Sequence, residues 1–397
     1  MAPPAPSAAA VPAAELSAIA ASSNAFGFDL YAQLSTKPGN LVISPASIST
    51  ALAMTWGGAK GDTATAMANV LHLTGTPAQV MTASGGLSRT LTDPGREVTF
   101  RVANQLFGET TYAFEAPYLE QTRVAYGAPL ERVAFAKDPE AARSHINGWV
   151  EAKTERRIKD LIPSPSITRD TRLVLVNAIY FLGDWLEPFE TRATMPRPFF
   201  TTKAASKDVP TMHKTESFRY AKRDGASVIE LPYKGNAMAM VLVVPDAVDG
   251  LGKLEKAVDE AWLTGAVGAL HHERVALALP KFEVAPTEAV RLADLLKPMG
   301  MAVAFDRKRA DFTGIANPPS ADDRLYIAEV FHKAFVKADE KGTEAAAATA
   351  VTMARAGGAP AKPIELKADR PFLFFIRDTA TGLVVFMGRV ADPAAAG

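Results

Sequence analysis

The chain of 397 residues contains no cysteine. Disulfide bonds, thiol nucleophiles and thiolate metal sites are therefore excluded, but the compartment stays open because an exported protein need not carry disulfides. The 43 Lys and Arg residues balance the 43 Asp and Glu residues, so the net charge points to no nucleic acid and no anionic membrane surface. The best apolar run, at 238–245, is much shorter than the roughly 18 residues of a membrane-spanning helix. We expect neither nucleic acid nor membrane as a partner.

Motifs for catalysis are also missing. No GxSxG is present, which argues against a hydrolase nucleophile elbow. GGAKGDT at 57–63 lacks the Gly-Lys-Ser/Thr ending of a phosphate loop and is interpreted as a helix stop and turn. His271 and His272 are adjacent, so on a strand their rings would face opposite sides, which is unfavourable for a zinc site. The sequence predicts no enzyme, no metal site and no cofactor.

The composition is that of a globular protein, with 48% hydrophobic and 22% charged residues. Length alone favours two or three domains, but no internal segment rich in Pro, Gly and Ser and no repeat suggests a linker. We therefore expect one domain over 15–397, preceded by a flexible Ala/Pro-rich extension at 1–14. The extension lacks a basic start and a continuous apolar stretch, so it does not form a signal peptide as it stands.

Periodicity predicts helices mainly in the first third of the chain. The apolar spacing of Phe26, Leu30 and Leu34 indicates a helix that begins near Leu16, and a Ser-Pro start at 44 predicts another that stops at Gly57. A third amphipathic helix is expected over 139–162, ended by Pro163.

Short segments rich in β-branched residues follow and are separated by turn signals. They include RLVLVNAIYF, SVIELPY, AMAMVLVVP and ERVALALPKFEV, and a hairpin is expected around 378–382. Helices followed by strands predict an α+β fold with mostly antiparallel sheets.

Five segments, in order, resemble those of the serpin family. They are NLVISPASISTALAM (40–54), LVNAIYFLGDW (175–185), ADFTGI (310–315), FHKAFVKADEKGTEAAAATA (331–350) and RPFLFFIRDTATGLVVFMGRVADP (370–393). The resemblance covers nearly everything after about residue 15. It implies three mostly antiparallel β-sheets, about eight or nine helices and an exposed reactive loop, here at about 340–362.

The segment 343–353 has the composition that insertion into a sheet would require. Read with the strand period of two, one face carries the small or apolar residues Thr343, Ala345, Ala347, Thr349, Val351 and Met353. The other face has no bulky side chain and a single charge, Glu344. The resemblance implies that this segment becomes a new strand of the large sheet after a protease cuts the loop.

The resemblance also assigns roles to individual residues. The hinge of the loop comprises Glu340, Gly342, Thr343, Glu344, Ala345, Ala346, Ala347, Ala348 and Thr349, with Gly342 permitting the backbone reversal. A polar cluster under the centre of the sheet, the shutter, comprises Ser44, Ser47, Asn177 and His332. Trp185 and Lys281 belong to the breach, the region where insertion starts, and Lys281 is expected to pair with Glu340.

The position of the cut depends on family spacing counted from Gly342. This spacing gives a reactive bond between Ala356 and Gly357, which suits an elastase-like or subtilisin-like serine protease. A cut one residue earlier, between Arg355 and Ala356, would suit a trypsin-like protease, because the guanidinium needs an acidic pocket.

The resemblance therefore implies a monomeric inhibitor that traps a serine protease covalently and is used once. The alternative is a non-inhibitory family member that acts as a binding or chaperone-like protein; its hinge would typically contain bulky, charged or Pro residues, and Glu344 is the only charged residue and no Pro occurs between Thr343 and Met353. We expect an extracellular or periplasmic bacterial protein, and a cytoplasmic one stays open.

Overall fold

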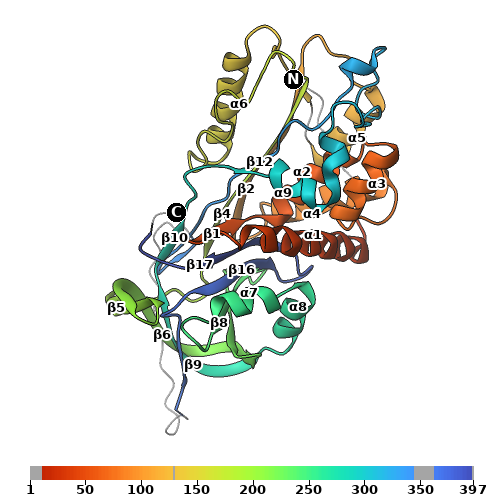
Figure 1. Ribbon diagram of the computed structural model, residues 1–397. Helices are drawn as coiled ribbons and strands as arrows, with labels where there is room; N and C mark the ends of the chain where they lie inside the picture. Colours follow the sequence, from red (N-terminus) through yellow and green to blue (C-terminus); the bar gives the residue numbers. More distant parts are fainter. Residues whose placement is uncertain (1–10, 128–129, 344–361, 396–397) are drawn as a thin grey trace.

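The computed structural model describes residues 11–127, 130–343 and 362–395 (Figure 1). Within these residues the α-helices are α1 (Ala13–Leu34), α2 (Pro45–Trp56), α3 (Gly61–Val70), α4 (Pro77–Leu91), α5 (Ala116–Tyr126), α6 (Pro139–Lys153), α7 (Leu251–Ala257), α8 (Glu260–Gly268) and α9 (Ala293–Leu296). The strands are β1 (Leu41–Ile43), β2 (Thr99–Glu109), β3 (Leu130–Val133), β4 (Leu173–Asp184), β5 (Met195–Thr202), β6 (Ala205–Arg223), β7 (Ala226–Pro232), β8 (Met238–Pro245), β9 (His271–Pro280), β10 (Phe282–Val284), β11 (Val290–Arg291), β12 (Phe331–His332), β13 (Val336–Ala338), β14 (Gly342–Thr343), β15 (Ile364–Lys367), β16 (Phe372–Asp378) and β17 (Val384–Val390). The predicted α+β class is confirmed.

The largest sheet has nine strands in the order β1-β17-β16-β8-β7-β6-β9-β15, with β5 also paired to β6. Every residue of β8 and β17 is buried, which explains why their sequences are continuous apolar runs rather than alternating ones. Strand β6 is 19 residues long and pairs with β5, β9 and β7 along its length. Hydrogen bonds through β6 therefore join β5, β7 and β9 into one continuous sheet.

The central sheet contains the long strands β2 and β4. Its hydrogen-bonded order is β14-β4-β2-β3, while β10 pairs with β13 and β11 with β12. Along the described residues, β4 meets the chain of β12 and β13 through one parallel bridge, between Ile179 and Ala334. The long seam between β4 and residues 331–338 is therefore held by few backbone hydrogen bonds.

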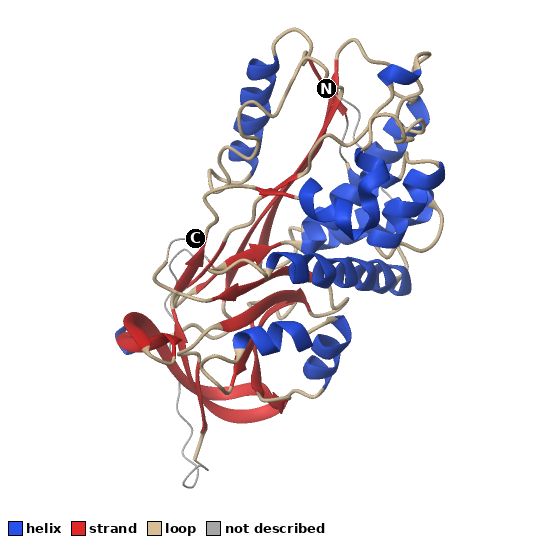
Figure 2. Cartoon of the chain, in the orientation of Figure 1, coloured by secondary structure: helices blue, strands red, loops and turns tan. Residues whose placement is uncertain are grey.

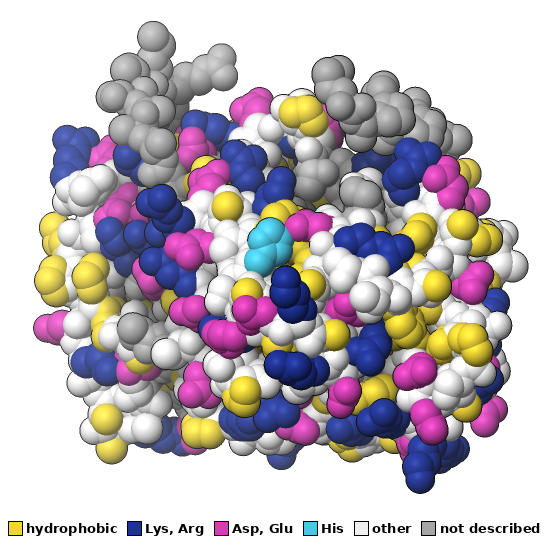
Figure 3. All heavy atoms as spheres, turned by 90° about the horizontal axis from the view of Figure 1, so that it is seen from above, with side chains coloured by type: hydrophobic (Ala, Val, Ile, Leu, Met, Phe, Trp, Pro, Cys, Tyr) yellow, Lys and Arg dark blue, Asp and Glu magenta, His cyan; other side chains and the backbone are white. Residues whose placement is uncertain are grey.

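Helices cover both faces of the central sheet. Figure 2 shows α6 on one side of β2 and β4, and the group that includes α1 to α5 on the other. Phe26, Leu30 and Leu52 belong to the apolar cluster on the latter side, as the helical spacing predicts. No described helix is long and apolar enough to cross a membrane. Basic and acidic side chains are interspersed over the face seen in Figure 3, which agrees with the zero net charge of the chain.

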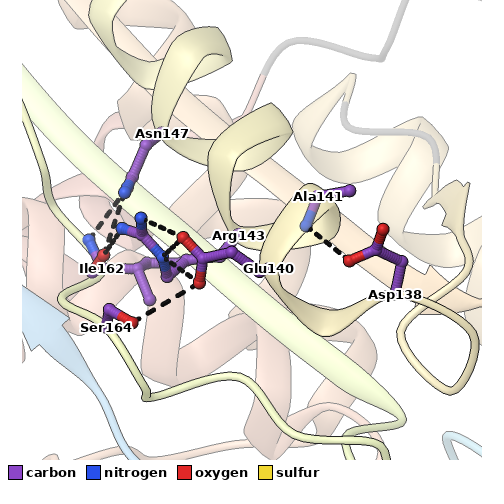
Figure 4. A network of polar contacts seen from close by, with 7 residues as sticks. All are labelled: Asp138, Glu140, Ala141, Arg143, Asn147, Ile162 and Ser164. Carbon is purple, nitrogen blue, oxygen red and sulfur yellow. Dashed lines mark hydrogen bonds and ion pairs between the residues drawn. The ribbon is translucent and has the colours of Figure 1, made fainter.

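The helix expected over 139–162 ends earlier than predicted. α6 stops at Lys153, and Glu155 and Arg156 then adopt φ values of 50° and 64°, which a helix cannot contain. The chain turns back along α6, so that Asn147 accepts from the Ile162 amide and donates to the Ile162 carbonyl, both at 2.9 Å (Figure 4). The apolar residues beyond 153 are buried as expected, but they lie on a segment that runs back along α6.

A second side chain fastens this segment to α6. Arg143 Nη1 donates to the same Ile162 carbonyl at 2.8 Å, and the guanidinium also pairs with Glu140 (Figure 4). Ile158 and Ile162 pack with α6 against β2 and β4. α6 and residues 154–166 therefore form one cover over this face of the central sheet.

Candidate functional site

The chain reverses direction immediately before residues 344–361. After β13 it turns at Glu340 and Lys341, and β14 then runs antiparallel to β4, with Gly342 opposite Asp184 and Thr343 opposite Gly183. Three backbone bonds fix the turn: the Trp185 amide donates to Lys341 at 2.8 Å, Phe189 to Glu340 at 2.7 Å, and Asp339 to Gly342 at 2.9 Å. The first residues of the predicted loop are therefore already part of the central sheet.

Gly342 is required at this reversal for a reason different from the one expected. Its φ does not lie in the left-handed region, so the conformational freedom of glycine is not what the turn uses. A Cβ atom at this position would instead lie 2.0 Å from the Gly183 carbonyl oxygen and 2.7 Å from the Asp184 Cα. β14 approaches β4 too closely for any side chain at 342.

Thr343 is 1% exposed and is held by an aromatic pair. Its hydroxyl lies 2.7 Å from the hydroxyl of Tyr233, whose pKa is raised by burial. The Tyr233 ring stacks on Trp185, with centroids 4.6 Å apart and planes 15° from parallel. The Trp185 indole N–H donates to the Asp339 carbonyl at 2.9 Å. The aromatic pair thus contacts both arms of the turn.

Glu340 is 8% exposed, and its carboxylate binds two side chains. Lys281 Nζ lies 2.8 Å from Oε2, and the Thr194 hydroxyl donates to Oε1 at 2.8 Å. Burial alone would raise the pKa of Glu340, but these hydrogen bonds outweigh it and hold the pKa below its ordinary value. The ion pair that was expected between Glu340 and Lys281 is present.

Three of the four predicted shutter residues meet beneath the sheet. The Ser44 amide donates to His332 Nε2 at 3.1 Å, the Ser44 hydroxyl donates to the Val385 carbonyl at 2.6 Å, and the Ser47 amide donates to Ser44 Oγ at 3.3 Å. The backbone of Asn177 pairs with Asn104 within β4 and β2, but its side chain lies outside the described part.

His332 is fully enclosed, and burial lowers its pKa to about 3. The ring is therefore neutral at pH 7. Because Nε2 accepts from Ser44, the ring proton is on Nδ1, and that N–H is buried with no hydrogen-bond partner among the side chains that the structure describes, which do not include that of Asn177.

The hinge residues 344–349 and both candidate reactive bonds, Ala356-Gly357 and Arg355-Ala356, lie outside the described residues. What the structure does define is the start of the loop at Thr343 and its return at β15.

A family model described as "Serpin (serine protease inhibitor)" matches residues 21–393. The chain belongs to the serpin family. It is 37% identical to the leukocyte elastase inhibitor of Equus caballus over 378 residues, covering 93% of this chain and 97% of the relative. Uncleaved ovalbumin superposes with a TM-score of 0.82 at 30% identity, covering 94% of this chain and 100% of ovalbumin. Human thyroxine-binding globulin superposes with a TM-score of 0.85 at 26% identity, covering 96% and 100%. The predicted serpin fold is confirmed.

A feature of this serpin that the sequence did not reveal lies at the far end of β4. Between β4 and residues 325–331 there is a cavity of about 90 Å³. Leu173, Leu175 and Leu325 are among its lining residues on the side of the main helices, and Leu161 and Ile162 on the side of α6. The cavity lies beside the same edge of β4 that pairs with β14, at the opposite end of that strand.

Thr194 and Tyr233 are the two site residues that sequence reasoning missed. They are 146 and 110 residues away from their partners Glu340 and Thr343. No local pattern marks either of them, since Tyr233 simply follows an apolar strand and Thr194 a short turn.

Proposed function

We propose that this serpin inhibits serine proteases by single-use covalent trapping, in which the cut loop becomes a strand of the central sheet. The observation that carries the proposal is β14. Two residues of the loop are already paired with β4, and the first inward-facing side chain, Thr343, is already buried. Insertion would therefore extend an existing strand and would not need to nucleate a new one.

The register of β14 defines the path of the rest of the loop. Because Gly342 is opposite Asp184 and Thr343 is opposite Gly183, continued antiparallel pairing sets Met353 opposite Leu173, the first residue of β4. Odd-numbered loop residues then share the face of Thr343, which is directed into the core. This is the face whose residues the sequence makes small or apolar.

Insertion along this path requires the seam to open. The Ile179–Ala334 bridge has to break, and residues 350–353 reach the cavity at the far end of β4. About ten new ladder hydrogen bonds, at roughly 0.5–1.5 kcal/mol net each, would release on the order of 10 kcal/mol. The uncut form is therefore metastable relative to the inserted form.

The chemistry of trapping follows from this difference in free energy. The protease serine attacks the carbonyl before the cut, the peptide bond breaks, the new amino group leaves, and an ester joins the protease to the inserting strand. Each inserted residue displaces the attached enzyme by about 3.3 Å. The reactive bond that we propose is Ala356-Gly357, with Arg355-Ala356 as the alternative. The name of the Equus caballus relative, leukocyte elastase inhibitor, supports an elastase-like target.

The shutter residues Ser44, Ser47, Asn177 and His332 would serve the opening of the seam. The contacts of Ser44 with His332 Nε2 and with the Val385 carbonyl lie beneath the strands that would have to separate. Trp185 and Lys281 would hold the hinge until the cut. We propose that the protein acts as a monomer outside the cytoplasm. There it would meet released serine proteases.

The decisive experiment mixes the protein with an elastase, a subtilisin, a trypsin and a chymotrypsin and analyses the products on denaturing gels. We expect a band at the summed mass that survives boiling in detergent, and none when the protease serine has been blocked beforehand. The specificity of the protease that gives this band indicates which of the two reactive bonds is cut. Cleavage of the loop by every protease without such a band would refute trapping and favour a binding role, as the thyroxine complex of the globulin illustrates for that protein.

A further inference from the structure

Strand β5 runs between the two ends of the reactive loop. Immediately before it, Thr194 binds the hinge carboxylate of Glu340 at 2.8 Å. Toward its other end, the Phe200 amide donates to the Asp369 carbonyl at 2.7 Å, just beyond β15, to which the loop returns. A protease that binds the loop therefore approaches the molecule next to β5.

The free edge of β5 cannot add another strand. The Phe200 amide points away from β6, so the alternating residues Pro196 and Pro198 have the same outward orientation. Proline lacks an N–H, and this edge consequently offers no backbone donor at either position. Residues 195–198 are nevertheless all exposed, and Met195 is 50% exposed. A partner at this edge must be recognised through side chains.

The side chains beside this edge include an unneutralised positive charge. A cavity of about 550 Å³ lies between β5, β6, β9 and β15, and Arg197 lines it. The two carboxylates in its wall have basic neighbours: Glu365 lies 3.5 Å from Lys367, and Asp369 lies 2.8 Å from Arg370. Arg197 has no such partner among the residues that the structure describes.

His213 adds a second group with a free ring nitrogen in the same cavity. Its Nδ1 lies 3.1 Å from the Thr211 carbonyl and 3.3 Å from the Ala193 carbonyl. Because both neighbours are acceptors, Nδ1 carries a proton and donates. Nε2 has no hydrogen-bond partner among the described residues. It is free to form a hydrogen bond with a partner.

We propose that the exposed residues Met195–Pro198 of β5 and this cavity form a second contact surface for the attacking protease. Arg197 receives an acidic side chain of the protease, and Met195 and the two prolines contact apolar surface around it. This inference rests on the proposed function, because it assumes that a protease binds the loop. It adds a determinant of target choice that does not depend on the residues at the reactive bond.

The test compares Arg197→Glu with the wild type in the second-order rate constant for inhibition of the panel protease that forms the covalent complex fastest. Charge reversal at an interface rim acts mainly on association. We expect a decrease of about tenfold or more at low salt that largely disappears at about 0.5 M salt. The amount of inhibitor consumed per protease should not change. Lys308→Glu is the matched control, because Lys308 is exposed, carries the same charge and lies outside this surface.

Equal rate constants for the wild type, Arg197→Glu and Lys308→Glu would overturn the second contact surface while leaving covalent trapping intact. Equal losses in both variants would also overturn it, because the effect would then reflect total charge. Absence of any covalent complex in the wild type would instead refute the proposed function itself. Unfolding midpoints of the three proteins should coincide, since both substitutions replace exposed side chains.

Discussion

The register of β14 makes a prediction that can be tested by disulfide trapping. Antiparallel pairing continued from Thr343 and Gly183 sets Met353 opposite Leu173 and Ala347 opposite Ile179. Because the chain has no cysteine, two cysteines introduced at either pair are the only thiols in the protein. The variant Leu173→Cys with Met353→Cys should form a disulfide after the loop is cut, and not before.

Geometry restricts this result to the proposed register. Directly opposite residues have Cα atoms about 4.5–5.5 Å apart, within the range of about 4.4–6.8 Å that a disulfide accepts. Leu173→Cys with Val351→Cys is displaced by two residues, or about 6.6 Å along the strand, which sets the Cα atoms about 8 Å apart. This mismatched pair should stay reduced and serves as the control.

The assay counts free thiols by labelling under denaturing conditions, with and without prior cleavage. A disulfide at 179/347 without one at 173/353 would show that insertion stops before the cavity at the far end of β4. Efficient closure of the mismatched 173/351 pair would refute the register. Free thiols in every cleaved variant would refute insertion along β4 altogether.

Three further predictions concern the hinge and the shutter. Thr343→Arg places a charge at a position that is already buried, at a cost on the order of several kcal/mol, so it should displace β14 from β4 and leave insertion no existing strand to extend; we expect the inhibitor to become a substrate, and gels that still show wild-type trapping would contradict this. Lys281→Met removes one charged hydrogen bond from Glu340, and because the lysine is partly exposed we expect a loss of only about 1–2 kcal/mol, seen as a lower unfolding midpoint of the uncut form that Lys281→Arg restores. His332 has a folded pKa of about 3, so between pH 6.5 and 3 the unfolded chain binds a proton that the folded chain does not. Stability should therefore fall with decreasing pH in that window, by up to about 1.4 kcal/mol per pH unit, and His332→Gln should lose this part of the slope in denaturant titrations at pH 7 and 5.

Local patterns in the sequence predicted most elements but not how far each one extends. The helix near Leu16 and the apolar strand at 238–245 follow from period and composition, and both are present. The end of α6 was missed because Ile158 and Leu161 keep an apolar spacing after the helix has stopped. Left-handed conformations at Glu155 and Arg156 carry no signal of their own, since neither is a glycine.

The site could be predicted only as far as the family resemblance reached. It gave the pair of Glu340 with Lys281, but the neighbouring contacts of Thr194 and Tyr233 depend on residues more than 100 positions away. The reason for Gly342 was also beyond the sequence, because a close approach to Gly183 appears only when β4 and β14 are placed side by side.

The pairing of β1 with β17 has a consequence for how the protein reaches its uncut form. Leu41 is opposite Arg389, and the Asn24 side chain accepts from the Val384 amide at 2.7 Å, so elements from the two ends of the chain meet at the β1 edge of the nine-stranded sheet. Contacts of such sequence separation form slowly, and they cannot form during synthesis until the last strand has left the ribosome. The reactive loop is made only shortly before β17, when the edge of β4 already exists. The edge of β4 is therefore present throughout the time in which β1 and β17 have still to find each other.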